Sequence, residues 1–331
     1  MSAVQSLSTG LPMVSIVVPC YNARRWIGET LASTRQRSSF QVELIVVDDG
    51  STDGSGELVE RDFPEARLVR TENRGCSAAR SHGAGLARGK YLKYLDSDDL
   101  LAEGSVARQV ALAETSGAEV VYGDWRRLVQ EGDAWVAGET VAQTWQVVHA
   151  DIEVAFFTHM WCPTGAYLWR ADFLRQRHPG WHSGLPVIQD ARYALDAACA
   201  GAAFVHDPAI AAWYRTHTSG SVATSSPVKF ARDCWRNALE MRDRWEQAGK
   251  LNEVRRKALL EVLEHIAFDM YPRERSLARE VVRSARSIDP RWRPTGSRWR
   301  RWLGGTFGFE TVARLRLGLE QCRRLRRDKT A

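Results

Sequence analysis

The sequence lacks an apolar run that approaches the ~20 residues a helix needs to cross a bilayer. Its first residues, MSAVQSLSTGLPM, have neither the basic stretch nor the apolar stretch of a secretory signal peptide. The 6 cysteines are dispersed without a C-x-x-C pair, so the sequence predicts neither a zinc site nor a disulfide framework. These absences favour a protein of the reducing cytoplasm that spans no membrane.

Two common nucleotide-binding signatures are also missing. No G-x-G-x-x-G follows the first predicted strand, which disfavours a dehydrogenase of the dinucleotide-binding type. No G-x-x-x-x-G-K-[ST] occurs either, which disfavours a P-loop enzyme.

Excess positive charge is confined to the end of the chain. The formal net charge is +6, yet the first 290 residues carry 34 basic against 37 acidic side chains. Residues 291–331 carry 12 Lys or Arg against three acids, interleaved with tryptophans. This basic tail either lies on an anionic membrane surface or packs as a helix whose arginines are solvated. Nucleic-acid binding is disfavoured because no recognised fold motif supports it.

Short apolar strands alternate with helical patterns from residue 14 to about residue 205, which is typical of an α/β domain with a largely parallel sheet. From about residue 226 the apolar spacing becomes helical, with a break expected at Tyr271-Pro272. The pattern predicts strands over 14–18, 43–47, 66–69 and 91–95, later strands near 120–122 and 166–168, and helices over 23–37, 76–87 and 100–116.

Acidic side chains follow two of the predicted strands at the point where each strand ends. Asp48-Asp49 follows the second strand, and Asp96-Ser97-Asp98-Asp99 follows the fourth. The carboxyl ends of parallel strands meet at the edge where ligands of open α/β sheets bind. Clustered carboxylates repel one another, and their hard oxygens suit Mg²⁺ or Mn²⁺. The alternative is that these residues only form turns and helix caps.

Four motifs occur in order along this part of the chain. These are Pro19-Cys20-Tyr21-Asn22, then VDDGSTD at 47–53, then Asn73-Arg74-Gly75 with Ala79-Arg80, and finally the D-x-D-D. Together they resemble the family-2 glycosyltransferases of the GT-A fold, with Ser81 replacing a common Asn. The resemblance implies an α/β nucleotide-diphospho-sugar transferase fold with a mostly parallel central sheet, followed by a C-terminal helical region. We therefore expect a flexible N-terminus at 1–12, a GT-A catalytic domain at 13–221, a helical extension at 222–290 and the basic tail at 291–331.

The resemblance also implies a nucleotide site made by Pro19, Tyr21, Asp49, Arg80 and Asp96. Tyr21 would pack near the base, and Asp49 would accept a hydrogen bond from it. Arg80 would offset phosphate charge, while Asp96 would bind the ribose. Two alternatives stay open: Tyr21 as an ordinary edge aromatic, and Arg80 as a solvated helix residue.

Further family positions concern a metal ion and the acceptor. Asp98 would hold Mn²⁺ or Mg²⁺, and His217 of a Y-R-x-H-x-x-S element would complete the metal shell or touch phosphate, unless it is structural. Asp99 either supports the site or caps the next helix, and we expect the cap. Asp190 would be the general base, unless it is a simple N-terminal helix acid, and Gln189 replaces the Glu usual before it. Five aromatic residues either line an acceptor cleft or pack in the core: Phe156, Phe157, Trp161, Trp169 and Trp181.

The resemblance implies an inverting, metal-dependent glycosyltransferase of bacterial polysaccharide or glycoconjugate synthesis. A carboxylate can take the proton of the acceptor hydroxyl as attack proceeds, and a divalent cation can stabilise the leaving diphosphate. The expected partners are a nucleotide-diphosphate sugar, with UDP as the expected nucleotide, and a saccharide or lipid-linked acceptor. The expected place is the cytoplasm, with the tail on the inner face of the membrane. The alternative is a catalytically silent GT-A-like module that binds sugar nucleotides or tethers partners at a membrane.

Overall fold

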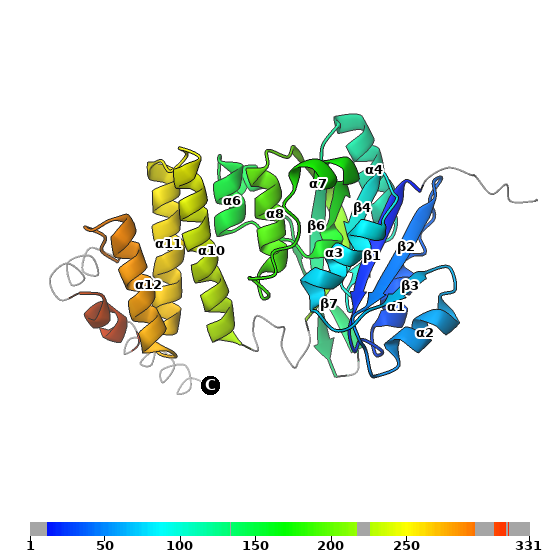
Figure 1. Ribbon diagram of the computed structural model, residues 1–331, viewed down its shortest axis with the longest axis horizontal. Helices are drawn as coiled ribbons and strands as arrows, with labels where there is room; N and C mark the ends of the chain where they lie inside the picture. The colour runs from blue at the N-terminus through cyan, green and yellow to red at the C-terminus, as the bar shows by residue number, and fades with distance from the viewer. Residues whose placement is uncertain (1–11, 133, 217–225, 295–307, 316, 318–331) are drawn as a thin grey trace, which may run out of the picture. The chain divides into compact units, whose positions relative to one another are not determined.

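The structure is a computed structural model that describes residues 12–132, 134–216, 226–294, 308–315 and 317. The chain divides into two compact units, Met1–Ser221 and Val222–Ala331. Figure 1 shows the strands in the first unit, coloured from blue to green, and the long helices of the second unit, coloured from yellow to orange. His217, residues 1–11 and most of the basic tail lie outside the described residues.

The first unit is built on one mixed sheet. Among the described residues its strand order is β3-β2-β1-β4-β8-β6-β9-β5, with β7 paired to β6. The first four strands pair in parallel, as expected, whereas β8 runs antiparallel to both β4 and β6. The chain enters β8 from the edge where the parallel strands end, directly after the short helix η1 (Thr164–Ala166), and this sets its direction. The strands are β1 (Val14–Cys20), β2 (Val42–Asp48), β3 (Arg67–Arg70), β4 (Tyr91–Tyr94), β5 (Leu100–Leu101), β6 (Val120–Glu131), β7 (Ala134–Val141), β8 (Tyr167–Arg170) and β9 (Phe204–Thr216).

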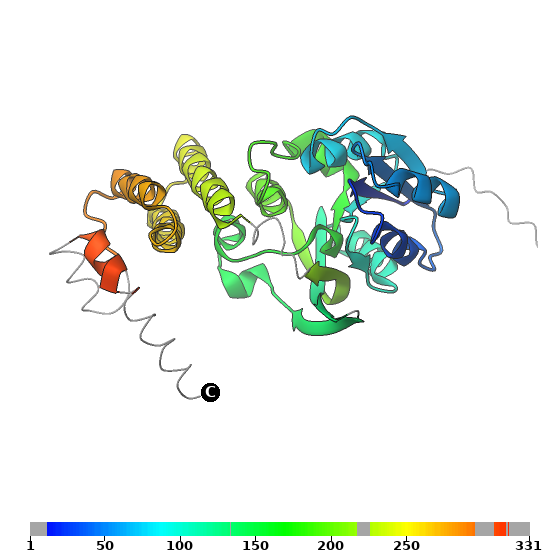
Figure 2. The ribbon, with the colours of Figure 1, turned by 90° about the horizontal axis from the view of Figure 1, so that it is seen from below.

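Helices lie on both faces of this sheet (Figure 2). Alternate residues of a strand point to opposite faces, and Ile16 of β1 belongs to a core cluster that includes Ile27 of α1 and Val59 of α2. Val17 points instead to α3. A Cβ added to Gly83 of that helix would lie 2.4 Å from Cγ1 of Val17. The helices are α1 (Ile27–Thr34), α2 (Ser55–Asp62), α3 (Cys76–Leu86), α4 (Ser105–Ser116), α5 (Trp145–Val148), α6 (Ile152–Thr158), α7 (Ala171–Arg177) and α8 (Gln189–Cys199).

One predicted helix is wrong at its start. Leu100 and Leu101 form β5, which pairs antiparallel with Trp213 and Ala212 of β9, and the helix begins only at Ser105. The apolar spacing of residues 100–116 fits a helix, but the backbone groups of the first two residues pair with a strand far along the chain. The local pattern contains no signal of that partner.

The second unit consists of helices. They are α10 (Pro227–Gln247), α11 (Glu253–Met270) and α12 (Arg275–Ile288), so the predicted break at Tyr271-Pro272 is confirmed. Residues 309–315 are also helical, and the ring of Phe309 packs on Phe268 at a centroid distance of 4.9 Å. Val312 and Ala313 are buried, so this part of the tail packs on its own unit, while Leu315 is exposed. Among the helices that the structure describes, none combines the length and the apolar character needed to cross a membrane.

Candidate active site

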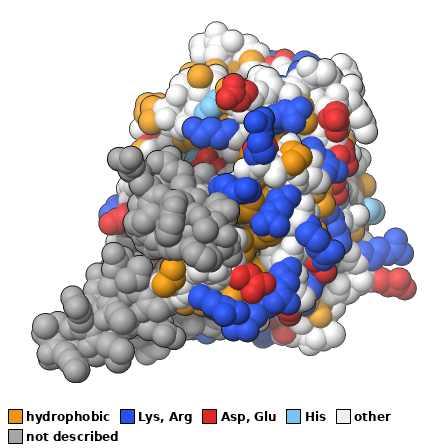
Figure 3. Space-filling model, turned by 90° about the vertical axis from the view of Figure 1, so that its left-hand side faces the viewer, with side chains coloured by type: hydrophobic (Ala, Val, Ile, Leu, Met, Phe, Trp, Pro, Cys, Tyr) orange, Lys and Arg blue, Asp and Glu red, His pale blue; other side chains and the backbone are white. Residues whose placement is uncertain are grey.

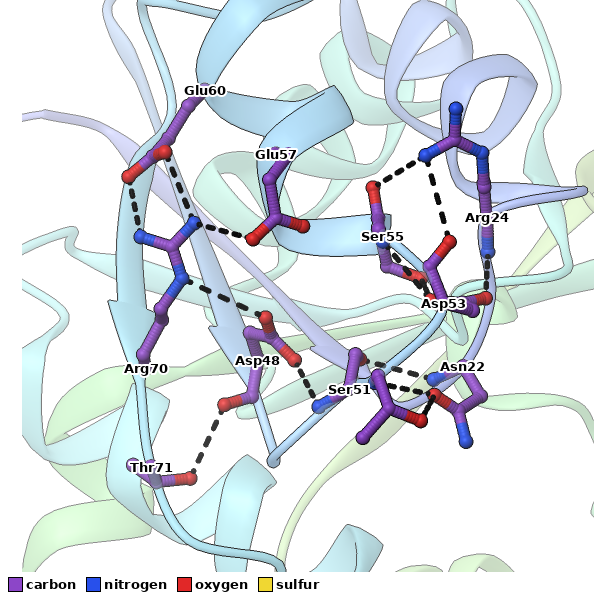
Figure 4. A network of polar contacts seen from close by, with 12 residues as sticks. Asn22, Arg24, Asp48, Ser51, Asp53, Ser55, Glu57, Glu60, Arg70 and Thr71 are labelled. Carbon is purple, nitrogen blue, oxygen red and sulfur yellow. Dashed lines mark hydrogen bonds and ion pairs between the residues drawn. The ribbon is translucent and has the colours of Figure 1, made fainter.

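The loops that follow β1 and β2 are held together by a network of hydrogen bonds (Figure 4). The backbone N–H of Asn22 donates to Ser51 Oγ (3.0 Å), and the backbone N–H of Thr52 donates to Asn22 Oδ1 (2.8 Å). The backbone N–H of Arg24 donates to Asp53 Oδ2 (2.9 Å). Ser51, Thr52 and Asp53 therefore build the loop.

Tyr21 and Asp49 lie beside this network. Tyr21 directly follows Pro19 and Cys20 at the end of β1, and 52% of its surface is exposed, so its ring is accessible to a ligand. Asp49 is buried, and its carboxylate accepts hydrogen bonds from the backbone N–H groups of Arg74 (3.0 Å) and Gly75 (2.8 Å). These bonds fix the loop before α3. A carboxylate has about four lone-pair sites, so Asp49 keeps the capacity to accept from a ligand.

Arg80 lies on α3 with only 3% of its surface exposed, so the alternative of a solvated helix residue is excluded. It forms an ion pair with Asp96, which follows β4, and its guanidinium lies over the ring of Trp181, 4.4 Å from the centroid. Its Nε and Nη1 are buried and find no hydrogen-bond partner among the residues that the structure describes. Buried donors without partners are unfavourable, and phosphate oxygens are well suited to satisfy them.

The D-x-D-D segment is fixed by Arg215, which β9 brings to the end of β4. The backbone N–H of Arg215 donates to Asp99 Oδ1 (2.8 Å), and Arg215 Nη1 donates to the backbone carbonyl of Asp98 (3.0 Å). The buried guanidinium lies 5.4 Å from the ring centroid of Trp26 and 5.3 Å from that of Trp135. Helix α4 begins without a side-chain cap, so the predicted capping role of Asp99 is wrong. Its carboxylate is held by β9 instead.

The carboxylates after β4 lie close enough to affect one another. Burial, and then the charges of Asp98 and Asp96, raise the pKa of Asp99 well above its usual value. Asp99 Oδ2 is buried and has no hydrogen-bond partner within the described part of the chain. No group of three His, Cys, Asp or Glu side chains within those residues is arranged to hold a metal ion. Mg²⁺ is usually held by one or two carboxylates together with substrate phosphates, and the oxygens of Asp96 and Asp98 fit that donor set.

Asp190 lies in the first turn of α8 and accepts two hydrogen bonds. Trp161 Nε1 donates to its Oδ2 (2.7 Å), and the backbone N–H of Ala191 donates to its Oδ1 (2.9 Å). Burial raises the pKa of Asp190, although the hydrogen bond from Trp161 opposes the rise. A carboxylate whose pKa is raised toward neutrality is a better general base than an ordinary one. Beside it, Gln189 Oε1 accepts from Ser77 Oγ of α3 (2.5 Å).

The predicted acidic residues come together around Tyr214 of β9. Burial, followed by the charges of four carboxylates, raises the pKa of this tyrosine; the four are Asp99, Asp190, Asp96 and Asp98. The fold therefore gathers carboxylates from two distant segments of the sequence, with Arg80 attached through its ion pair to Asp96. Sequence reasoning missed Arg215, although it stands next to Tyr214 in the Y-R-x-H element.

The five aromatic residues divide between the core and the site. Phe156, Phe157 and Trp169 are buried, which agrees with the core alternative. Trp161 and Trp181 are partly exposed, and they contact Asp190 and Arg80, respectively. No feature of the sequence distinguished these two tryptophans from the other three.

A mixed sheet with helices on both faces, and acids gathered at the ends of its parallel strands, is the architecture of the GT-A fold. The family model described as "Glycosyl transferase family 2" matches residues 15–171. The chain carries a domain of this family, and the predicted family and fold are confirmed.

Relatives and solved structures agree with this assignment. The chain is 28% identical over 199 residues to the uncharacterized glycosyltransferase EpsJ of Bacillus subtilis, covering 56% of each chain. It is 36% identical over 112 residues to the succinoglycan biosynthesis protein ExoO of Rhizobium meliloti, covering 33% of this chain and 32% of that one. The chain thus spans about half, or less, of the length of these curated relatives.

Two solved structures share the fold at low sequence identity. TarS of S. aureus, solved with UDP, has a TM-score of 0.56 and 20% identity, with 80% of this chain and 73% of that chain covered. The mannosyltransferase PcManGT of Pyrobaculum calidifontis, solved with GDP-Man and Mn²⁺, has a TM-score of 0.52 and 16% identity, with 93% and 87% covered.

Proposed function

We propose that this chain is an inverting glycosyltransferase that moves a sugar from a nucleotide-diphosphate donor to a hydroxyl acceptor. The observation that carries the proposal is the convergence of Asp96, Asp98, Asp99 and Asp190 around Tyr214. Beside these carboxylates, Arg80 has two buried donor nitrogens without partners in the described structure. A site that pairs a cluster of carboxylates with a buried arginine suits a phosphorylated, polyhydroxylated ligand.

Each group then has a task that its surroundings permit. Tyr21 stacks on the base, Asp49 accepts a hydrogen bond from it, and Arg80 donates to the diphosphate. Asp190 takes the proton of the acceptor hydroxyl while that oxygen attacks the anomeric carbon from the side opposite the diphosphate. Because a single base acts and no carboxylate bonds to the sugar, the anomeric configuration is inverted. A divalent cation held by Asp98, when bound, supplies charge that stabilises the leaving diphosphate.

The donor and the setting are proposed from the relatives. Structures of TarS hold UDP or UDP-GlcNAc, and that of PcManGT holds GDP-Man and Mn²⁺. These complexes support a nucleotide sugar, for which we propose UDP, and a Mn²⁺ or Mg²⁺ ion. ExoO is described as a succinoglycan biosynthesis protein. This supports a role in bacterial polysaccharide or glycoconjugate assembly, with a saccharide or a lipid-linked sugar as acceptor.

The second unit supports contact with an anionic membrane surface. Helix α12 exposes an arginine stripe (Arg275, Arg279, Arg283 and Arg286), and Figure 3 shows Lys and Arg side chains gathered on this unit. Residues at spacings of three or four lie on one face of a helix. Exposed Arg291, Arg293 and Arg314 of the basic tail add to this charge. We propose that this surface, with residues 291–331, holds the enzyme on the cytoplasmic face of the membrane.

The donor site is tested by thermal stabilisation of the full chain with UDP, GDP, ADP and CDP, each with and without Mn²⁺. One nucleotide should raise the melting temperature in a Mn²⁺-dependent way, and Asp98→Asn should abolish the dependence on Mn²⁺ because it removes a charged ligand. Asp172→Asn is the matched control, since this side chain is exposed on α7. The proposal fails if no nucleotide stabilises the wild type, or if Asp98→Asn responds as the wild type does.

The transfer step is tested with the nucleotide and its sugar once that screen has named them. Asp190→Asn should lower turnover by at least about a hundredfold, because general base catalysis contributes that much. Donor binding should stay intact, since Asp190 does not hold the nucleotide. Unchanged turnover in this variant would exclude Asp190 as the base.

A further inference from the structure

Trp161 makes a direct contact with the proposed base that the family resemblance did not predict. It lies between α6 and η1, and its indole Nε1–H donates to Asp190 Oδ2 at 2.7 Å. The other oxygen, Oδ1, is held by the backbone N–H of Ala191 at 2.9 Å. Both oxygens are therefore restrained from different sides, which fixes the plane of the carboxylate while each oxygen keeps a further lone pair.

The indole of Trp161 is itself held by two other rings. Its centroid lies 5.1 Å from that of Trp125 and 5.4 Å from that of Tyr214, with interplanar angles of 87° and 83°. Trp125 and Tyr214 also meet edge to face, at 5.9 Å. Such T-shaped pairs are favourable and directional. The three rings thus form an aromatic triad that holds the N–H of Trp161 toward Asp190.

The surroundings of Asp190 show what this N–H does electrostatically. Burial raises the pKa of Asp190, and Asp96 raises it further, while Trp161, Arg80 and the N–H of Ala191 lower it. Within the described residues, further titratable groups whose charges interact with it are Cys76 of α3, Tyr167 of β8 and Tyr214 of β9. Among the interactions that lower the pKa of Asp190, the hydrogen bond from Trp161 is the largest.

We propose that Trp161 is a positioning residue for glycosyl transfer, whose indole N–H holds Asp190 ionised and oriented toward the acceptor hydroxyl. The inference rests on the function proposed above. In that step the acceptor oxygen forms a bond to the anomeric carbon, the bond from that carbon to the diphosphate oxygen breaks, and the acceptor proton goes to a free lone pair of Asp190. The electron pair of the broken bond leaves with the nucleoside diphosphate.

The pH dependence of turnover tests this role. Trp161→Phe keeps an aromatic ring but removes the hydrogen-bond donor, so the pKa of Asp190 should rise. In the pH profile of kcat/KM, the acid limb should therefore move to higher pH by about one unit. The donor KM should stay the same, because Trp161 does not contact the nucleotide site. Trp235→Phe is the matched control: it also removes an indole donor, but one that bonds to Ser284 Oγ (3.0 Å) in the second unit. Its acid limb should coincide with that of the wild type.

A second measurement needs neither substrate nor turnover. In the ¹⁵N-tryptophan-labelled full chain, the indole N–H resonance that disappears in Trp161→Phe should shift with pH in the wild type. In Asp190→Asn the same resonance should no longer shift, because the titrating carboxylate is gone. A Trp161 resonance that does not titrate in the wild type would show that the contact is absent, and the positioning role would be wrong.

The outcomes separate the two proposals. An active wild type, an inactive Asp190→Asn and an unshifted acid limb in Trp161→Phe would overturn the positioning role alone. An equal shift in Trp235→Phe would show that the loss of an indole donor far from Asp190 has the same effect, and would also overturn it. A wild type that binds nucleotide but shows no transfer, with a titrating Trp161 resonance, would overturn the proposed function and leave the contact in place.

Discussion

Lys93 is a lysine buried in the middle of β4, where its ammonium group has no access to water. Its Nζ donates to Gln109 Oε1 (2.6 Å) and to the backbone carbonyl of Tyr167 (3.0 Å). Burial lowers the pKa of Lys93 to about 7, although Asp207 opposes the change. An unfolded lysine titrates near pH ~10.4. Between these values the unfolded chain binds a proton that the folded chain does not, so this group makes the protein more stable as pH rises from 7 to 10.

Replacing this lysine should therefore flatten the pH dependence of stability. In Lys93→Met, the gain in the free energy of unfolding between pH 7 and pH 9 should be smaller than in the wild type by about 2 kcal/mol. Lys90→Met is the control, since Lys90 lies three residues away but is exposed in an ion pair with Glu114. Urea denaturation at pH 7, 8 and 9 measures both. An equal slope in wild type and Lys93→Met would show that the lysine stays charged when folded.

Single residues also show where sequence reasoning about the site reached its limit. The predicted site that joins Asp96, Asp98 and Asp190 came from the resemblance of the motifs to a known family. The partner of each carboxylate was not predictable in the same way. Asp99 is held by Arg215, and Asp190 by Trp161, through contacts between segments far apart in the chain. Such contacts depend on the fold as a whole, so local propensity assigned Asp99 a capping role that it does not have.

At the scale of the element, α3 approaches the sheet closely enough to require glycine. A Cβ at Gly83 would lie 2.4 Å from Val17 Cγ1 and 3.2 Å from Val47 Cγ2, whereas nothing lies within 4 Å of one at Gly85. Both glycines are in the helix, where alanine is intrinsically better by about 1 kcal/mol. Gly83→Ala should nevertheless destabilise the protein by about 1–3 kcal/mol through overpacking, and Gly85→Ala should stabilise it by up to about 1 kcal/mol.

Thermal and urea unfolding measure the stability of both variants. The two results compare the gain in helix propensity at Gly85 with the cost of overpacking at Gly83. Stabilisation by both substitutions would mean that α3 can move away from β1 and β2, which would also displace Arg80. Destabilisation by Gly85→Ala would mean that its exposed position has a role beyond helix propensity. Only the first of these results would contradict the close packing at Gly83.

The elements that sequence could predict are those determined by their own residues. The strands β1, β2 and β4 are rich in apolar residues and mostly buried on both faces, and each lies close to its predicted range. The strand β5 and the antiparallel direction of β8 were missed for a different reason. A strand of two residues exists only through its partner β9, and the direction of β8 depends on the side from which the chain enters the sheet. Neither property is contained in a local apolar pattern.

For the whole molecule, the unequal distribution of charge leads to a test of membrane contact. The arginine stripe of α12 and the tail carry the excess positive charge, whereas the first 290 residues are net negative despite including this stripe. Near an anionic bilayer each Arg contributes about 1 kcal/mol of binding free energy. The full chain should therefore sediment with phosphatidylglycerol vesicles but not with phosphatidylcholine vesicles, and binding should weaken as salt screens the charge.

Neutralising part of the stripe distinguishes local attraction from net charge. Changing Arg275, Arg283 and Arg286 to Gln should lower partitioning onto phosphatidylglycerol vesicles by about a hundredfold, since three contributions of about 1 kcal/mol are lost. The control changes three exposed arginines of the first unit to Gln and alters the net charge equally; they are Arg37, Arg61 and Arg67. That control should bind as the wild type does. Equal losses in the two variants would mean that only overall charge matters, and no binding by the wild type would exclude a membrane surface as the partner of the second unit.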